Sequence, residues 1–298
     1  MPAYQYDIET PDFYNLKTTC HMHGWVNLAP FSWDVNQQKL FFAMRADDIP
    51  VDLIIRQAKN SHIVVEVKSL ARLNSRQKDI IHYGLVRSLD LATHTNDLYR
   101  LSKSINKQYG NLVKKGAGRI LRAPSLWEDA AKTIFTTNCS WSLTQQMSIA
   151  ACSSQFSSIT ASGLYPFPAA RKIARISEDN IKNKMRVGYR AKYIKKLASQ
   201  LSNSNKQVWI ENLSEDELRT FFLGLEGFGP YAANHMMILS GFYTQIPVDT
   251  VVKSYIQRFH HSDDSQGFIE SHFEQWGQYK WWGLKLEQIT NNANWLGD

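Results

Sequence analysis

Apolar residues in the first quarter of the chain gather into short runs rich in β-branched and aromatic side chains, a pattern typical of strands. Turn-like clusters at 46–50 and 58–61 separate these runs. Because neighbouring parallel strands would need a much longer crossover, the spacing predicts an antiparallel meander. Segment 16–34 is expected to add one more strand and an irregular turn. The strands of the meander are expected at 39–45, 51–57 and 62–68.

From Asn74 onward the period of the apolar positions changes. Leucine and isoleucine recur at helical intervals through 76–105, which predicts helix there. Segments 106–111 and 114–118 have the glycine and polar composition of loops.

Helix starts are marked by two capping-box patterns, Ser125–Glu128 and Ser214–Glu217. The glycine and prolines of 162–168 break the chain between them. The helices are expected over 125–137, 143–156 and 214–224.

Together these patterns predict an α+β fold class, with an N-terminal antiparallel β-domain followed by an all-α bundle. The 298 residues are enough for two or three packed units. We expect the β-domain at 1–72, one helical subdomain made of 73–124 plus 253–298, and a second helical subdomain at 125–252.

Composition excludes several function classes. No run of 18 apolar residues is present, and the first residues lack the pattern of a secretory signal. The three cysteines are too few for a disulfide framework or a four-cysteine iron–sulfur cluster, and none forms a CxxC zinc pair. We therefore expect the protein to reside in a reducing compartment. In a bacterium this would be the cytoplasm, at the nucleoid, and in a eukaryote it would be the nucleus.

The net charge of +7 is unevenly distributed. Ten basic and two acidic residues lie between positions 166 and 200, whereas the last 36 residues hold six acidic and two basic ones. Solvated helix faces would account for such runs. The asymmetry also fits a polyanion such as nucleic acid on one side of the molecule.

Segment 222–252 is the most informative part of the chain. A capped helix ends near Gly224, residues 225–229 form a tight glycine turn, and Pro230 suits the first position of the next helix. Backbone N–H groups at such a helix N-terminus can bind a phosphate. A short apolar run then ends in the Pro-Val-Asp of 247–249.

Two other interpretations of this segment remain. Residues 227–232 fit the loose GxGxxG/A dinucleotide fingerprint, with Asp249 near the distance of a ribose contact. That fingerprint requires a strand before the first glycine, whereas a capped helix is expected here. Taken alone, Asp249 would be an ordinary N-cap of a following helix.

These motifs resemble the HhH-GPD DNA glycosylases, with their helix-hairpin-helix, Gly/Pro-rich loop and aspartate. The N-terminal meander is similar to the domain that precedes the helices in the 3-methyladenine glycosylase II and 8-oxoguanine glycosylase branches. The endonuclease III branch is disfavoured because its iron–sulfur cysteines are absent. The matching segments are 225–235, 246–252, 118–141, 186–198 and 276–284.

The resemblance implies a double-stranded DNA partner containing a damaged, flipped base. It makes Asp249 the catalytic carboxylate and lets the backbone of Gly227 and Gly229 hold a phosphate. It admits a Na⁺ or K⁺ ion at the carbonyls of Leu225 and Gly227 and implies no other cofactor.

The resemblance also assigns three DNA-binding side chains. Asn138 matches the residue that fills the hole left by the flipped base. Tyr189 and Arg190 match the pair that buckles the duplex and reads the orphaned partner. Core packing for Tyr189 and a solvated charge for Arg190 are the structural alternatives.

Pocket residues follow from the same resemblance. Tyr231 stands where bifunctional relatives carry a nucleophilic lysine, so we expect base hydrolysis without lyase activity. An aromatic residue there is similar to the 3-methyladenine branch, which stacks on cationic alkylated bases. His235 would line the same pocket or be a satisfied core histidine. Tyr279, Trp281 and Trp282 would complete an aromatic wall or belong to the core.

The lesion is the most open point. Leu143 stands where the oxoguanine branch would place an arginine that reads cytosine, which weakens cytosine-specific reading. With Tyr231, this favours a monofunctional enzyme for alkylated purines. The resemblance also implies a monomer, because glycosylases of this type wrap DNA alone. An 8-oxoguanine-type glycosylase and a catalytically idle DNA-binding protein are the alternatives. His23-Gly24-Trp25 is interpreted as a buried turn, with an approach to DNA or to the pocket as the alternative.

Overall fold

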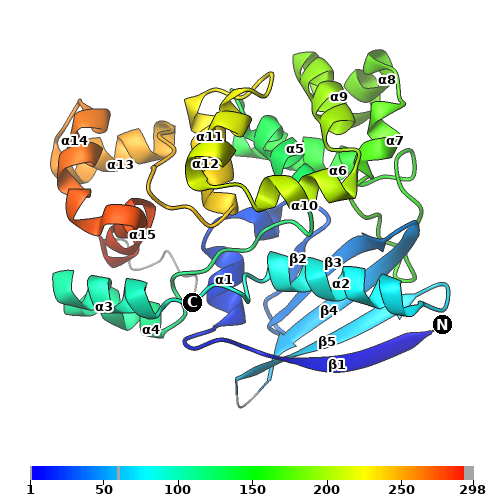
Figure 1. Ribbon diagram of the computed structural model, residues 1–298, viewed down its shortest axis with the longest axis horizontal. Helices are drawn as coiled ribbons and strands as arrows, with labels where there is room; N and C mark the ends of the chain where they lie inside the picture. The colour runs from blue at the N-terminus through cyan, green and yellow to red at the C-terminus, as the bar shows by residue number, and fades with distance from the viewer. Residues whose placement is uncertain (1, 59–60, 292–298) are drawn as a thin grey trace.

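One antiparallel sheet forms the N-terminal layer of the computed structural model, which describes residues 2–58 and 61–291 (Figure 1). The strand order is β1-β5-β4-β3-β2, and β3, β4 and β5 pair as consecutive neighbours. The predicted meander is therefore confirmed. Residues 59–60 of the turn expected at 58–61 lie outside the described residues. The strands are β1 (Ala3–Glu9), β2 (Ser32–Asp34), β3 (Lys39–Ala46), β4 (Ile49–Gln57) and β5 (His62–Ser69).

Helix α2 (Ser75–Ser88) lies along the sheet (Figure 1). Gly84 lets it approach β3 closely, since a Cβ at this position would lie 2.7 Å from the Met44 methyl carbon. Most residues of the central strands are buried, among them Leu53, Ile55 and Val65. These apolar runs are the pattern from which the strands were predicted.

Strand β1 and helix α1 (Leu16–His21) were not predicted. Every residue of β1 is half-buried or exposed, so this edge strand lacks the apolar run that marked the other strands. Segment 16–34 does contain one strand, β2, but a helix precedes it, capped by the Asn15 side chain, which accepts the Thr18 N–H.

The helix predicted through 76–105 is two helices, α2 and α3 (Asn96–Ile105). Asp90 interrupts it with a φ of 55°, and its carboxylate accepts the Ile120 N–H at 3.3 Å. This contact with a distant residue has no signature in the local pattern.

The loop predicted at 106–111 is wrong, because α4 (Lys107–Lys114) occupies it. Asn106 caps this helix by accepting the Gln108 N–H at 2.8 Å. Gly110 serves packing rather than a turn, since an added Cβ would lie 2.7 Å from the Lys103 Cβ. The composition resembled a loop because close approach of two helices also selects glycine.

Ser125 caps α5 as predicted, and Glu217 accepts the Ser214 N–H in the predicted capping box of α11. The helix expected at 143–156 runs instead over 141–151, because Ser140 is its N-cap. Residues 292–298 of the segment expected at 253–298 lie outside the described residues. The remaining helices are α5 (Leu126–Thr136), α6 (Trp141–Ala151), α7 (Ala170–Ala174), α8 (Glu178–Met185), α9 (Ala191–Gln200), α10 (Ser204–Glu211), α11 (Glu215–Leu223), α12 (Pro230–Leu239), α13 (Thr250–His260), α14 (Ser265–His272) and α15 (Lys280–Asn291).

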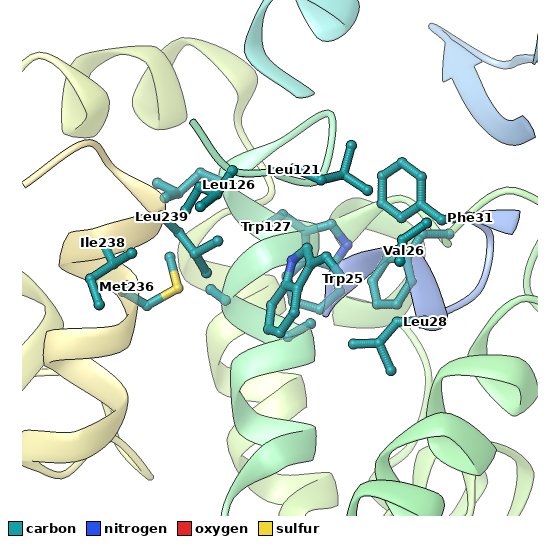
Figure 2. Close-up of a cluster of buried hydrophobic side chains, with 14 of the residues drawn as sticks. Trp25, Val26, Leu28, Phe31, Leu121, Leu126, Trp127, Met236, Ile238 and Leu239 are labelled. Carbon is teal, nitrogen blue, oxygen red and sulfur yellow. The ribbon is translucent and has the colours of Figure 1, made fainter. Parts of the chain in front are cut away.

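The N-terminal region and the helices share one buried core. Figure 2 shows Trp25, Val26 and Leu28 packed close to Trp127 of α5. The indole N–H of Trp25 donates to Asp129 of α5 at 2.7 Å. The α+β fold class is thus confirmed. Within the described residues, no helix is both long enough and apolar enough to cross a membrane.

Candidate active site

A cavity of about 860 Å³ opens where segments from across the chain converge. Its walls come from the α5–α6 loop, the α11–α12 hairpin, the segment before α13, one face of α15 and the N-terminal His23-Gly24-Trp25 segment. The lining residues include His23, Trp25, Asn138, Trp141, Tyr189, Tyr193, Gly227, Gly229, Tyr231, His235, Asp249, Lys253, Trp281 and Lys285.

The glycine hairpin forms as the sequence predicted, with α11 before it and Pro230 opening α12. Gly227 has a φ of 91°, and a Cβ there would lie 2.7 Å from the Tyr193 ring. Glycine is therefore required both by the left-handed backbone and by the space. Because helix α11 precedes the turn, the strand that a dinucleotide fingerprint needs is not at this position.

Asp249 is both a helix cap and a wall of the cavity. One carboxylate oxygen accepts the Val252 N–H at 2.8 Å, which fixes the side chain at the start of α13. Tyr231 lies in the same wall, and burial together with the negative charge of Asp249 raises the pKa of its hydroxyl to about 12. The cap interpretation of Asp249 is correct, and it does not exclude a role in the cavity.

Two histidines meet in the floor of the cavity. The Nε2 atoms of His23 and His235 lie 2.7 Å apart, and Nδ1 of His235 lies 3.1 Å from the Thr133 hydroxyl. Tyr231 stacks on His235 with an interplanar angle of 8°. The left-handed Gly24 turns the chain between His23 and Trp25, and the Trp25 bond to Asp129 anchors this turn. Only Trp25 of the segment is buried, whereas His23 and Gly24 are half-buried, and His23 and Trp25 also line the cavity.

Burial keeps this histidine pair neutral. It lowers the pKa of His235 to about 3, with a smaller contribution from the charge of Lys285. The pKa of His23 is lowered in the same direction by burial, and then by His235. The floor therefore consists of two uncharged rings.

Lys285 of α15 is a cavity residue that the sequence reasoning did not single out. Burial lowers the pKa of its ammonium to about 8, while the charge of Asp249 partly opposes this shift. Its Nζ lies 5.5 Å from the centroid of the Trp281 ring. Lys285 follows Trp281 by four residues, a spacing that places both side chains on one face of a helix. This spacing was the sequence signal that could have identified Lys285.

The loop between α5 and α6 presents Asn138 to solvent in a left-handed conformation, with a φ of 48°. Arg190 is only 5% exposed, and its guanidinium donates to the carbonyls of Thr137 and Asn138. Tyr189 is 54% exposed, and the Arg190 guanidinium lies over its ring. Arg190 therefore holds the loop in position, while Asn138 and Tyr189 project at the cavity mouth.

The predicted aromatic wall is only partly present. Trp281 lines the cavity, whereas Trp282 is fully buried beside Tyr243 and Tyr279 is not among the lining residues. Trp25 and Trp141 supply aromatic surface instead. Leu143 lies on α6 with 37% of its surface exposed and does not line the cavity.

Residues 139–278 match the model of the HhH-GPD superfamily base excision DNA repair proteins. This segment contains the hairpin and Asp249. The chain therefore contains the HhH-GPD domain of the base excision repair DNA glycosylases. No curated protein matches the chain.

Solved structures share the whole fold. The 3-methyladenine DNA-glycosylase from Archaeoglobus fulgidus has 18% sequence identity and a TM-score of 0.74, covering 97% of this chain and 99% of its own. The apo 8-oxoguanine glycosylase/lyase from Clostridium acetobutylicum has 17% identity and a TM-score of 0.71, covering 95% and 94%. The latter enzyme bound to double-stranded DNA with cytosine opposite 8-oxoguanine has 18% identity and a TM-score of 0.69, covering 97% and 98%.

Proposed function

We propose that this protein removes alkylated purines from double-stranded DNA by hydrolysing the N-glycosidic bond of a flipped nucleotide. The observation that carries the proposal is the position of Asp249, at the wall of an aromatic cavity that also includes the glycine hairpin. A damaged duplex anchored at the hairpin would direct its extruded base into this cavity.

Asp249 supplies the chemistry in this proposal. As the bond between C1′ and N9 lengthens, positive charge develops on the deoxyribose, and the nearby carboxylate stabilises that charge more than the neutral ground state. The base leaves with the bonding electrons, and a water oxygen bonds to C1′ while its proton passes to Asp249 or to solvent. A purine alkylated at N3 or N7 is cationic and departs as a neutral base, which makes it a good leaving group.

The walls of the cavity suit such a base. Trp25, Tyr231 and Trp281 offer aromatic surface to a cationic ring. The neutral His23 and His235 add no positive charge that would repel it.

The mouth of the cavity suits DNA. Backbone N–H groups around Gly227 and Gly229 would hold a phosphate at the N-terminus of α12. Asn138 would fill the space left by the flipped base, with Tyr189 against the neighbouring bases and Arg190 supporting the loop from behind. The Leu225 carbonyl accepts the Phe228 N–H at 3.1 Å and keeps a second lone pair, so it and the Gly227 carbonyl could coordinate a Na⁺ or K⁺ ion.

The position and the lowered pKa of Lys285 favour a second candidate function, that of a glycosylase/lyase. Its amine shares the cavity with Asp249, and a lysine with a pKa near 8 is partly neutral and nucleophilic at physiological pH. Attack of the neutral amine on C1′ would displace the base, and opening of the deoxyribose ring at the C1′–O4′ bond would give a Schiff base. Loss of a C2′ proton and of the 3′ phosphate by β-elimination would then cut the strand.

A single-turnover assay on methylated duplex DNA tests the first candidate. We expect free 3-methyladenine or 7-methylguanine, and strand breaks only after alkali. Borohydride trapping on the same duplex tests the second, with Lys285→Gln compared with Lys253→Gln, an exposed lysine at the cavity rim. Covalent trapping that depends on Lys285 alone would establish the lyase. Absence of base release from a panel of alkylated, oxidised and deaminated bases would leave a DNA-binding protein.

A further inference from the structure

A second cluster of chemically reactive side chains lies outside the cavity, where α13, α14 and α15 meet (the orange-to-red helices of Figure 1). His260 ends α13, His272 ends α14, and Glu287 lies in the middle of α15. The Nε2 atom of His260 is 2.6 Å from one Glu287 oxygen, and that of His272 is 2.8 Å from the other. The three ligand atoms all lie within 4.8 Å of one another.

One aromatic side chain packs against both imidazole rings. Phe268 lies against both, with centroid distances of 4.5 Å to His260 and 4.6 Å to His272. The Tyr255 hydroxyl donates to Glu287 at 2.9 Å and accepts from Asn291 at 2.8 Å. Ligands oriented in this way by neighbouring groups are typical of metal sites.

We propose that His260, His272 and Glu287 bind one Zn²⁺ ion. Two imidazole nitrogens and a carboxylate oxygen form a donor set that zinc uses in proteins, and a water molecule would complete four-coordination. The last 36 positions of the sequence, which include His272 and Glu287, hold six acidic and two basic residues, and this negative balance favours a cation.

Only a small opening of the cluster is needed. Zinc bonds of about 2.0–2.2 Å at tetrahedral angles place neighbouring ligand atoms about 3.4 Å apart. The nitrogen–oxygen distances of 2.6 and 2.8 Å would therefore widen by less than about 1 Å. The His272 side chain is 36% exposed and can supply this movement by rotating its ring.

The ion would tie together the helices that carry the cavity residues. Helix α13 runs from its cap Asp249 to His260, a length of about 16 Å at the usual helical rise. Helix α15 carries both Glu287 and the cavity residue Lys285. A zinc ion at the far end of α13 would hold the two helices in a fixed relation.

The experiment measures zinc binding by the full chain without an affinity tag, stripped with a chelator and dialysed. We expect one zinc per chain by elemental analysis and calorimetry. A hundredfold excess of zinc over Kd should raise the Tm by about 5 °C. Neither readout depends on glycosylase activity, so this proposal stands or falls separately from the proposed function.

His272→Gln is the decisive variant, because the glutamine amide can still donate to Glu287 but is a poor zinc ligand. We expect zinc affinity to fall by at least about a hundredfold, while the metal-free Tm stays near that of the wild type. His94→Gln, an exposed histidine of the α2–α3 turn, should bind zinc like the wild type. Absence of stoichiometric binding by the wild type, or equal binding by His272→Gln, would show that the cluster is only a hydrogen-bonded triad.

Discussion

The side chain of Asp249 caps a helix and also has the catalytic role that we propose. Its carboxylate caps α13 through the Val252 N–H and also faces the cavity. Asparagine caps helices about as well as aspartate, so the two roles can be separated by one substitution.

We predict that Asp249→Asn lowers the single-turnover rate of base release by about 10²–10³-fold or more. The Tm should change little, because the cap is retained. Asp264→Asn is the matched control, since Asp264 caps α14 through the Gly267 N–H and does not line the cavity. Base release by Asp249→Asn at the wild-type rate would refute the catalytic assignment.

The His23–His235 pair makes the native state sensitive to acid. Between pH 6.5 and about 3 an unfolded histidine binds a proton that native His235 does not, so protonation favours unfolding. The stability contributed by the neutral ring is fully present above about pH 6.5 and decreases as the pH falls.

We predict that the free energy of unfolding falls by about 2 kcal/mol between pH 7 and pH 5 on account of His235 alone. His235→Gln should show a correspondingly smaller loss over the same interval in urea titrations. His94→Gln should lose as much stability as the wild type. Parallel pH dependences for wild type and His235→Gln would contradict a buried neutral ring.

At the scale of the elements, the hairpin between α11 and α12 offers a paired comparison. Gly227 combines a left-handed backbone with contact to Tyr193, whereas Gly229 has a φ of −95° and open space at its Cβ position.

We predict that Gly227→Ala lowers the free energy of unfolding by about 1–3 kcal/mol, whereas Gly229→Ala changes it by less than about 1 kcal/mol. Denaturant titrations of both variants give the comparison. DNA affinity should also fall for Gly227→Ala, because the hairpin amides would lose their orientation. Equal free energies of unfolding for the two variants would show that Tyr193 moves aside without a loss of stability.

At the scale of the whole molecule, the proposed function requires basic residues beside the cavity. Lys253 lies at the mouth of the cavity, and Lys192 and Lys196 of α9 lie beside the hairpin through their ion pairs with Glu226. Binding of DNA to such a surface releases counterions.

We predict that duplex affinity falls by about a hundredfold between 50 and 200 mM salt, as expected for a few phosphate contacts. Lys253→Gln should reduce the slope of log K against log salt by about one. Lys78→Gln on α2, near Tyr4 and away from the cavity, should leave the slope unchanged. Fluorescence anisotropy at several salt concentrations would measure this, and a salt-independent affinity would argue against binding through phosphates.

The sequence alone determined the features that depend on local chemistry. The strands β3–β5, the caps at Ser125 and Ser214 and the hairpin with Pro230 were all predictable, because each is encoded within a few neighbouring residues. The position of Asp249 as a helix cap was predictable in the same way, whereas its catalytic role followed from the resemblance to a family and stays a prediction.

Only the tertiary structure decided which residues, distant from one another in the sequence, lie together at the cavity. His23 and His235 are 212 positions apart, and no periodicity relates them. Lys285 became a cavity residue only through the packing of α15, and Arg190 became a support for the Asn138 loop only because it is buried. Local sequence patterns reflect the stability of a turn or a helix cap. The walls of the cavity depend instead on how separate elements pack around one core.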